Sequence, residues 1–369
     1  TLGMGPWRAF FAVSLPLARP AIVAGIALAL METLADYGTV AYFAVNTFTT
    51  GIYRAWFSLG DRVAAAQLAA MLLSFVLFLL MVERVSRGRA RYHNTTGRNR
   101  PLAGARLGGI GAALAVVACV MPLLLGFVLP AMLLLKMALT EGDAQFGERF
   151  LLLSRNSFLL AGITACVGVL LALLMAYGAR LSKGALATGL NRLVGLGYAV
   201  PGAVIAVGVL IPVTRLDTWL AGQWEQWFGS NPGLLLTGGI AALVYAYLVR
   251  FLAVALHTVE SSLAKITPNM DDAARCLGLG QGETLRRVHA PMLRGSLFTA
   301  GLLVFVDVMK ELPATLVMRP FNFDTLATQT YTLASDERLA EASTASLAIV
   351  VVGLLPLIAL SRQVSRARQ

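Results

Sequence analysis

The most constraining feature of this sequence is a series of apolar runs, each long enough to cross the roughly 30 Å hydrocarbon core of a bilayer. Hydrophobic residues make up 57% of the chain and charged residues only 13%, whereas a soluble domain carries about 25% charged residues. Because backbone polar groups in lipid must be satisfied within each segment, we expect an all-α, polytopic transmembrane helical bundle. The predicted spans are residues 20–43, 63–83, 107–135, 157–179, 194–214, 235–257, 295–318 and 343–361.

The basic residues are concentrated in alternate loops between these spans. Loops 1–19, 84–106, 180–192, 258–294 and 362–369 hold 20 of the 30 Lys and Arg residues, and the loops on the other side hold 8. The positive-inside rule therefore places the first set, with the C-terminus, in the cytoplasm. The basic stretch 84–106 is then a topology determinant rather than a nucleic-acid site, since no recognised nucleic-acid-binding fold accompanies it.

The outer loops and several prolines lead to further structural predictions. Three tryptophans near residue 224 are typical of a short helix at the membrane interface, and the acidic stretch 320–342 could face an external partner. Pro201, Pro212 and Pro313 are expected to kink or break helices.

The sequence repeats itself at an offset of 275 residues. A shift this long indicates two duplicated halves, which in transporters can be related by an axis normal to the membrane. The matched pairs include Gly3 with Gly278, Pro16 with Pro291, Glu32 with Asp307, Asp36 with Glu311, Phe48 with Phe323, Thr50 with Thr325 and Asp61 with Asp336.

The repeat predicts the domain organisation. Residues 1–83 are interpreted as the C-terminal remnant of a first half, 84–106 as a cytoplasmic linker, 107–361 as a complete second half with six spans, and 362–369 as a cytoplasmic tail. Since the first half shows only two spans, we expect on the order of 170 further residues upstream, an N-terminal truncation relative to the duplicated plan.

The long inner loop at about 258–294 has the pattern of two short helices joined by glycine. Asp271 and Asp272 follow Pro268-Asn269, as acidic residues do in the first turn of a helix. Gly278 and Gly280 are suited to end that helix. Leu285, Val288 and Met292 then suggest a second, amphipathic helix leading into the membrane.

This loop resembles the Glu-Ala-Ala (EAA) loop of binding-protein-dependent ABC importer permeases. Asp272-Ala273-Ala274 is followed after three residues by Gly278 and after nine more by Val288-His-Ala-Pro291, with Asp, Val and Ala replacing the usual Glu, Ile and Leu. The first repeat keeps Gly3, Val13 and Pro16 at the same spacing. The resemblance implies that both loops dock into a separate ATPase subunit and transmit its motion.

The chain contains no nucleotide-binding or catalytic motif of its own. No P-loop occurs, so ATP and magnesium are expected on a partner subunit, with no cofactor bound by this chain and no enzymatic activity of its own. Neither an H-E-x-x-H metal motif nor a G-x-S-x-G nucleophile elbow is present. The three cysteines form no C-x-x-C pair, and the three histidines are isolated, so a fixed metal site is not expected.

Charged residues inside two predicted spans form the candidate translocation path. Asp307, Lys310 and Glu311 share one helix face at i, i+3 and i+4. They could neutralise one another and fix the helix, or they could line a cation pathway. Glu32 and Asp36 are the matching acidic pair, which we expect to face the first across the pseudo-two-fold axis. Arg250 could pair with a carboxylate or extend to the cytoplasmic interface.

The stretch from Phe305 to Arg338 closely resembles ferric iron permeases of the ABC class that fuse both halves in one chain, and Glu32-Thr-Leu-Ala-Asp36-Tyr-Gly-Thr39 is similar to the same family. The resemblance implies a type I ABC importer permease fold in the bacterial inner membrane. It also implies an ATPase dimer on the cytoplasmic side and a periplasmic ferric-binding protein as partners. A hard trivalent cation prefers oxygen ligands. Polyamine, thiamine or oxyanion cargo remains open, as does a secondary transporter driven by an ion gradient.

Overall fold

The computed structural model describes residues 5–87, 108–140, 147–182 and 184–366. Regular structure in these residues is entirely helical, which confirms the all-α prediction. Eight of the helical segments are long and apolar enough to cross a membrane. These segments are Trp7–Ala35, Arg62–Ser86, Gly109–Thr140, Glu148–Ser182, Gly202–Phe228, Ala241–Leu263, Gln281–Met309 and Leu339–Pro356.

The chain begins with α1 (Pro6–Ala9), the π-helical η1 (Phe10–Ser14), α2 (Leu15–Ala35), α3 (Gly38–Tyr42), α4 (Phe48–Tyr53), the π-helical η2 (Arg54–Ser58) and α5 (Arg62–Arg87). There follow α6 (Gly109–Leu123), the π-helical η3 (Leu124–Val128), α7 (Leu129–Thr140), α8 (Glu148–Ser182), α9 (Ala185–Val194), the 3-10 turn η4 (Gly197–Ala199), α10 (Gly202–Phe228) and α11 (Ala241–Leu263). The last elements are α12 (Pro268–Cys276), α13 (Gln281–Thr284), the π-helical η5 (Leu285–His289), α14 (Ala290–Met309), α15 (Pro313–Met318), α16 (Leu326–Ser335) and α17 (Leu339–Arg366).

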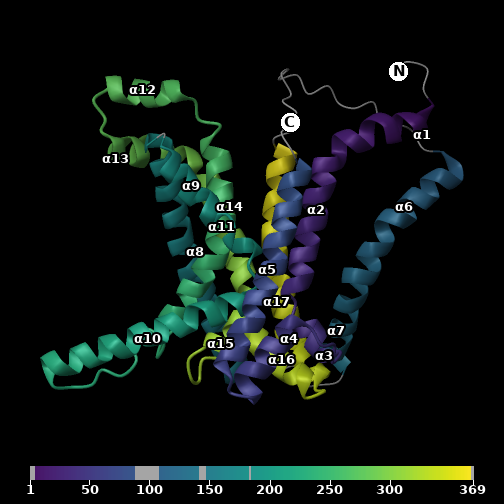
Figure 1. Ribbon diagram of the computed structural model, residues 1–369. Helices are drawn as coiled ribbons and strands as arrows, with labels where there is room; N and C mark the ends of the chain where they lie inside the picture. Colours follow the sequence, from purple (N-terminus) through teal and green to yellow (C-terminus); the bar gives the residue numbers. More distant parts are fainter. Residues whose placement is uncertain (1–4, 88–107, 141–146, 183, 367–369) are drawn as a thin grey trace.

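The long helices share one direction and the short helices gather at the two ends of the bundle. Figure 1 shows α2, α5, α8, α11, α14 and α17 side by side, with α12 and α13 at one end and α3, α4, α15 and α16 at the other. The main core lies among α8, α11 and α14, around the fully buried Leu160, Tyr247 and Val304. A second core joins α4 and α5 to the first turns of α10.

Two spans end earlier than the hydropathy predicts. The spans expected at 20–43 and 295–318 stop at Ala35 and Met309, because each helix breaks and a short helix, α3 or α15, follows. Pro313 occupies the first turn of α15, where its missing N–H costs nothing. Both spans instead extend toward the opposite end through the π-helical segments η1 and η5. The helix predicted to lead into the membrane is therefore continuous with α14.

The span expected at 194–214 is also broken. α9 ends at Val194, η4 follows, and Pro201 caps α10. A Cβ at Gly197 would lie 2.1 Å from the carbonyl oxygen of Val249, so glycine allows this segment to pass directly against α11. The break that Pro201 predicted is therefore real, whereas Pro212 lies inside a continuous α10.

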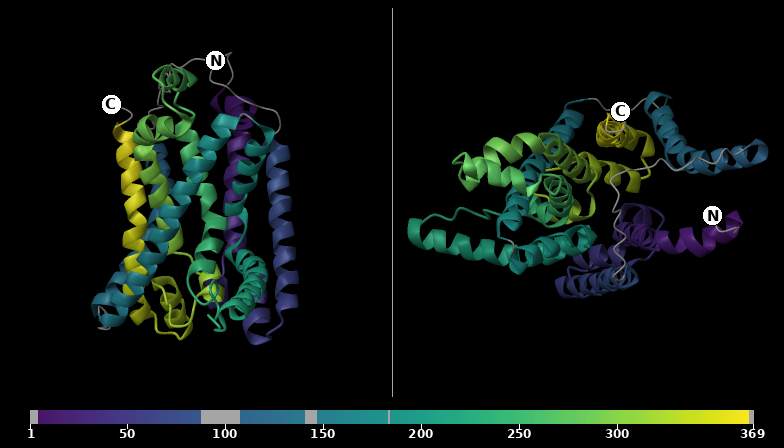
Figure 2. Two further views of the ribbon diagram at one scale, coloured as in Figure 1. Left: turned by 90° about the vertical axis from the view of Figure 1, so that its left-hand side faces the viewer. Right: turned by 90° about the horizontal axis from the view of Figure 1, so that it is seen from above.

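The tryptophans expected on a separate interfacial helix lie on the second half of α10 and are exposed. Figure 1 and the right view of Figure 2 show α10 running across the bundle and projecting from it. Buried Asp217 accepts hydrogen bonds from the N–H groups of Leu235, Leu236 and Thr237, which folds the following segment back along α10.

The acidic stretch 320–342 is not simply an open loop. It contains α16, whose Leu326, Thr328 and Leu333 are buried. Its helical part therefore belongs to the packed end of the bundle.

The structure keeps the internal repeat but changes its register. η1 with α2 and η5 with α14 begin 275 residues apart. Beyond α3 and α15 the offset becomes 278: Thr47 and Thr325 form equivalent capping boxes. The left-handed Ala44 and Asn322 mark the same shift. The predicted pairings of Phe48 with Phe323, Thr50 with Thr325 and Asp61 with Asp336 are therefore wrong by about three residues, because the second copy has a longer connection between the two short helices.

Candidate functional site

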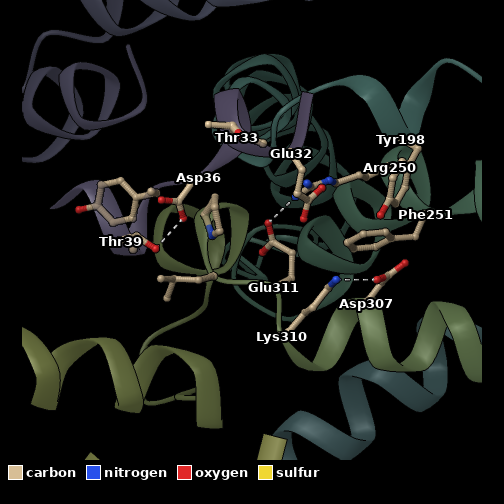
Figure 3. A pocket seen from close by; sticks show the side chains of 15 residues that line it. Glu32, Thr33, Asp36, Thr39, Tyr198, Arg250, Phe251, Asp307, Lys310 and Glu311 are labelled. Carbon is tan, nitrogen blue, oxygen red and sulfur yellow. Dashed lines mark hydrogen bonds and ion pairs between the residues drawn. The ribbon is translucent and has the colours of Figure 1, made fainter. Parts of the chain in front are cut away.

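The two helix breaks and the η4 break surround one cavity of about 490 Å³. Its lining comes from the α2–α3 connection of the first repeat and from η4, α11, α14 and α15 of the second. The sequence reasoning selected five residues for the translocation path, and all five line this cavity (Figure 3): Glu32, Asp36, Asp307, Lys310 and Glu311.

Glu311 is held in place by an ion pair and by the start of α15. Its Oε1 lies 3.2 Å from Nη1 of Arg250, and only 2% of the Glu311 side chain is exposed. The carboxylate also accepts hydrogen bonds from the N–H groups of Ala314 and Thr315 and from the Thr315 hydroxyl. Arg250 therefore takes the first of its two expected roles, pairing with a carboxylate, and the pair ties α11 to the break before α15.

Asp307 and Lys310 form a separate pair, with Oδ1 of Asp307 3.1 Å from Nζ of Lys310. The lysine is half exposed, whereas the aspartate is largely covered. The predicted self-neutralising cluster is thus divided: Lys310 neutralises Asp307, and Arg250, from another helix, neutralises Glu311. Sequence spacing alone could not predict this division, because the partner of Glu311 is on another helix, 61 residues earlier in the chain.

Glu32 and Asp36 are the remaining acidic residues of the lining. No ion pair involves either of them among the residues that the structure describes; Asp36 accepts one long hydrogen bond, 3.4 Å, from Thr39 Oγ1. The lining holds four carboxylates and two basic side chains, which leaves a net charge of −2. The uncompensated charge lies on the first-repeat side (Figure 3), so the cavity favours a cation.

Sequence reasoning missed Gly202, the first residue of α10, although its backbone lies directly against the ion pair. A Cβ there would lie 2.4 Å from Oε1 of Glu311 and 2.9 Å from Nη1 of Arg250. Nothing in the sequence marks this glycine, because Arg250 and Glu311 lie about 50 and 110 residues further along the chain.

We therefore expect Gly202→Ala to displace the Arg250–Glu311 pair and to lower the apparent melting temperature of the purified protein, with a loss of about 1–3 kcal/mol for overpacking. Gly208→Ala on the same helix is the matched control, because a Cβ at Gly208 meets nothing within 4 Å. Equal melting temperatures for the two variants would contradict the close approach.

Three tyrosines join the two repeats beside the cavity. The hydroxyls of Tyr37 and Tyr331 lie 2.9 Å apart, and the rings of Tyr37 and Tyr53 stack with centroids 3.8 Å apart. Tyr53 also donates a hydrogen bond to the carbonyl of Pro313. The break before α15 is therefore held from the first repeat as well as from α11.

The predicted docking loop forms two short helices, α12 and α13, at one end of the bundle (Figure 1), with the glycines between them as the sequence suggested. Gly278 has φ of +80°, a left-handed conformation that ends α12. Ala274 is buried, and Val288 is half-buried. Asp272, Ala273, Gly278 and Pro291 are exposed, as are Val13 and Pro16 in the first repeat. Gly3 lies outside the described residues, as does most of the 84–106 linker.

A polar network that the sequence did not reveal anchors α12 to α8. Arg180, near the end of α8, donates to Oδ2 of Asp271 at 2.9 Å, to the Leu263 carbonyl and to the Ile266 carbonyl. On the other side of the same carboxylate, Nε2 of the fully buried His289 lies 2.6 Å from Oδ1 of Asp271. Asp271, one position before the predicted Asp272, is thus the acid that holds the helix.

Burial raises the pKa of Asp271, but the hydrogen bond and charge of Arg180, together with His289, outweigh it and lower the pKa below the usual range. A carboxylate with a lowered pKa adds stability that is complete above its ordinary pKa and is lost as pH falls through the lowered value. The network is therefore intact at neutral pH.

The comparisons with known proteins agree with this architecture. Residues 168–368 match the family described as "Binding-protein-dependent transport system inner membrane component". The Fe(3+)-transport system permease protein FbpB 2 of Haemophilus influenzae is 26% identical over 367 residues, which cover 98% of this chain and 69% of that relative. The molybdenum transport system permease protein ModB of Escherichia coli is 32% identical over 100 residues, 24% of this chain and 44% of the relative. A crystal structure of a bacterial alginate ABC transporter in complex with an alginate pentasaccharide-bound periplasmic protein shares the fold, with a TM-score of 0.50 at 16% identity over 69% of this chain and 94% of that chain.

Proposed function

Because the chain belongs to the family of binding-protein-dependent transport system inner membrane components, it is a multi-pass permease of an ABC importer, and we propose that its cargo is ferric iron. The single observation that carries the cargo proposal is the cavity between the two helix breaks, with its net charge of −2. The similarity to an Fe(3+) permease along almost the whole chain supports the same choice.

The proposed path runs through this cavity, and its five charged residues have different tasks. Glu32 and Asp36 attract the cation, because their charge is not neutralised by an ion pair among the described residues. Asp307 with Lys310, and Glu311 with Arg250, instead hold the helix ends that shape the cavity. A transport site must also release its cargo, so two free carboxylates suit it better than a closed coordination shell. The negative lining disfavours an oxyanion.

We propose that transport is driven by ATP, bound with magnesium by a separate ATPase dimer. That dimer would dock on α12 and on the corresponding segment around Val13 and Pro16, at the end of the bundle that we assign, with the C-terminus, to the cytoplasm. The exposure of Asp272, Ala273 and Gly278 supports this docking, whereas Ala274 packs inward. We further propose that residues 1–83 and 107–361 act as two pseudo-symmetric halves, joined by the linker 84–106 and followed by the tail 362–369. A periplasmic ferric-binding protein would deliver the ion at the α15–α16 end.

The cargo proposal is tested with the double variant Glu32→Gln/Asp36→Asn. We expect uptake of radiolabelled ferric iron at limiting concentration to fall by about tenfold, the equivalent of about 1.4 kcal/mol of lost attraction. Membrane abundance should be unchanged, since no ion pair is broken. Glu225→Gln, which changes an exposed carboxylate of α10 outside the cavity, is the matched control and should transport normally.

The same assay separates the competing functions. Competition by polyamine, thiamine or molybdate with iron uptake would point to another cargo. Transport that continues in cells lacking the ATPase would support a secondary transporter and overturn the importer mechanism.

A further inference from the structure

A second cavity, away from the candidate path, lies where α10 passes the start of α5. It has a volume of about 450 Å³. The first turns of α10 pack against α5 through Ala203, Val204 and Val207, and the cavity opens just beyond this contact. Its lining residues are Trp56, Arg62, Val63, Ala66, Leu210, Ile211, Thr214 and Arg215.

The cavity brings together two arginines that are 153 positions apart in the sequence. No acidic residue lines it, and neither Arg62 nor Arg215 takes part in an ion pair within the part of the chain that the structure describes. Both guanidinium groups are exposed, so water screens their repulsion, but an anion in the cavity would be attracted by both charges. Both belong to the small set of basic residues in the loops assigned to the outer side, where positive charge is not needed for topology.

The rest of the lining is apolar. Val63 and Ala66 from α5, Leu210 and Ile211 from α10, and the indole of Trp56 form walls that would repel a small hydrated anion but suit a hydrocarbon chain. The site also precedes the exposed tryptophans of α10, and exposed tryptophans are typical of the level of the lipid headgroups.

We propose that this cavity binds a phosphate-bearing lipid of the outer leaflet. Arg62 and Arg215 would hold the phosphate, since guanidinium groups match phosphate oxygens in geometry and charge. The first methylenes of an acyl chain would lie against Leu210 and Ile211. The bound lipid would join α5 of the first repeat to α10 of the second without touching the transport cavity.

The experiment is native mass spectrometry of the intact permease–ATPase complex, purified from vesicles of phosphatidylglycerol and phosphatidylcholine. We expect the wild type to retain phosphatidylglycerol, and Arg62→Gln/Arg215→Gln to retain it at least about tenfold less, as loss of two charge-assisted contacts requires. Arg54→Gln is the matched control, because Arg54 is an exposed arginine on the neighbouring η2 and lies outside this cavity.

Three results would overturn the proposal. The double variant could retain the lipid like the wild type, Arg54→Gln could lose it equally, or inorganic phosphate at millimolar concentration could displace it, which would identify a soluble anion as the ligand. If the double Gln variant assembles poorly, the single variants Arg62→Gln and Arg215→Gln are compared with Arg62→Lys/Arg215→Lys, which keeps both charges. The Lys variant should retain more lipid than either single Gln variant, and equal retention would overturn the proposal.

Discussion

Replacing Arg250 with methionine is expected to destabilise the permease more than any other single change in the cavity, by about 3–5 kcal/mol. The variant leaves the Glu311 carboxylate almost fully buried without its counter-ion. The loss is large because the Glu311 carboxylate cannot turn toward solvent: three donors at the start of α15 hold it in place.

The measurement is thermal unfolding of the purified protein in detergent, as a double-mutant cycle. Arg250→Met/Glu311→Gln should recover part of the loss, because glutamine is neutral and its one carbonyl oxygen can still accept from the N–H and hydroxyl of Thr315. Lys310→Met is the control: it removes the cation of a pair whose lysine is 51% exposed, so its cost is about 1 kcal/mol or less. An Arg250→Met protein as stable as the wild type would show that the buried pair contributes nothing.

The sequence predicted the parts of the fold that depend on local composition. Hydropathy located all eight apolar segments, because a membrane requires about 20 apolar residues for each crossing. The ends of α12 were also predictable, since a proline start, acidic first-turn residues and a left-handed glycine are local signals. The five candidate path residues line one cavity, as expected if intramembrane charge is costly and is kept where it has a partner or a function.

What the sequence did not predict depends on contacts between distant segments. Apolar residues continue past Ala35 and Met309, so hydropathy cannot detect the two breaks that create the cavity. The partner of Glu311 was not predictable, because Arg250 is on another helix, 61 residues earlier in the chain. The three-residue change in repeat register was hidden because both copies contain similar Phe and Thr residues on either side of it.

Replacing Arg180 with alanine is the second large expected effect, and it acts on coupling rather than on cargo binding. Arg180 is the link between α8 and α12, and it makes three bonds of 2.9 Å to the Asp271 carboxylate and to the Leu263 and Ile266 carbonyls. Hydrogen bonds to charged groups contribute about 1.5–3 kcal/mol each. Without them, movement of α12 by the proposed ATPase would no longer be transmitted to α8, and iron transported per ATP hydrolysed should fall by about 100-fold, equivalent to about 2.8 kcal/mol.

The measurement is uptake and ATP hydrolysis in parallel, in vesicles containing the whole complex. Hydrolysis should continue, because the surface of α12 that we propose for docking stays exposed, while uptake is lost. Arg275→Ala is the matched control: Arg275 is on α12 itself, and its pair with Asp272 is exposed, with side-chain exposures of 70% and 64%, so breaking it should leave the ratio nearly unchanged. A normal ratio in Arg180→Ala would show that α12 drives the bundle by another route, and a complete loss of ATPase binding would assign Arg180 to docking instead of transmission.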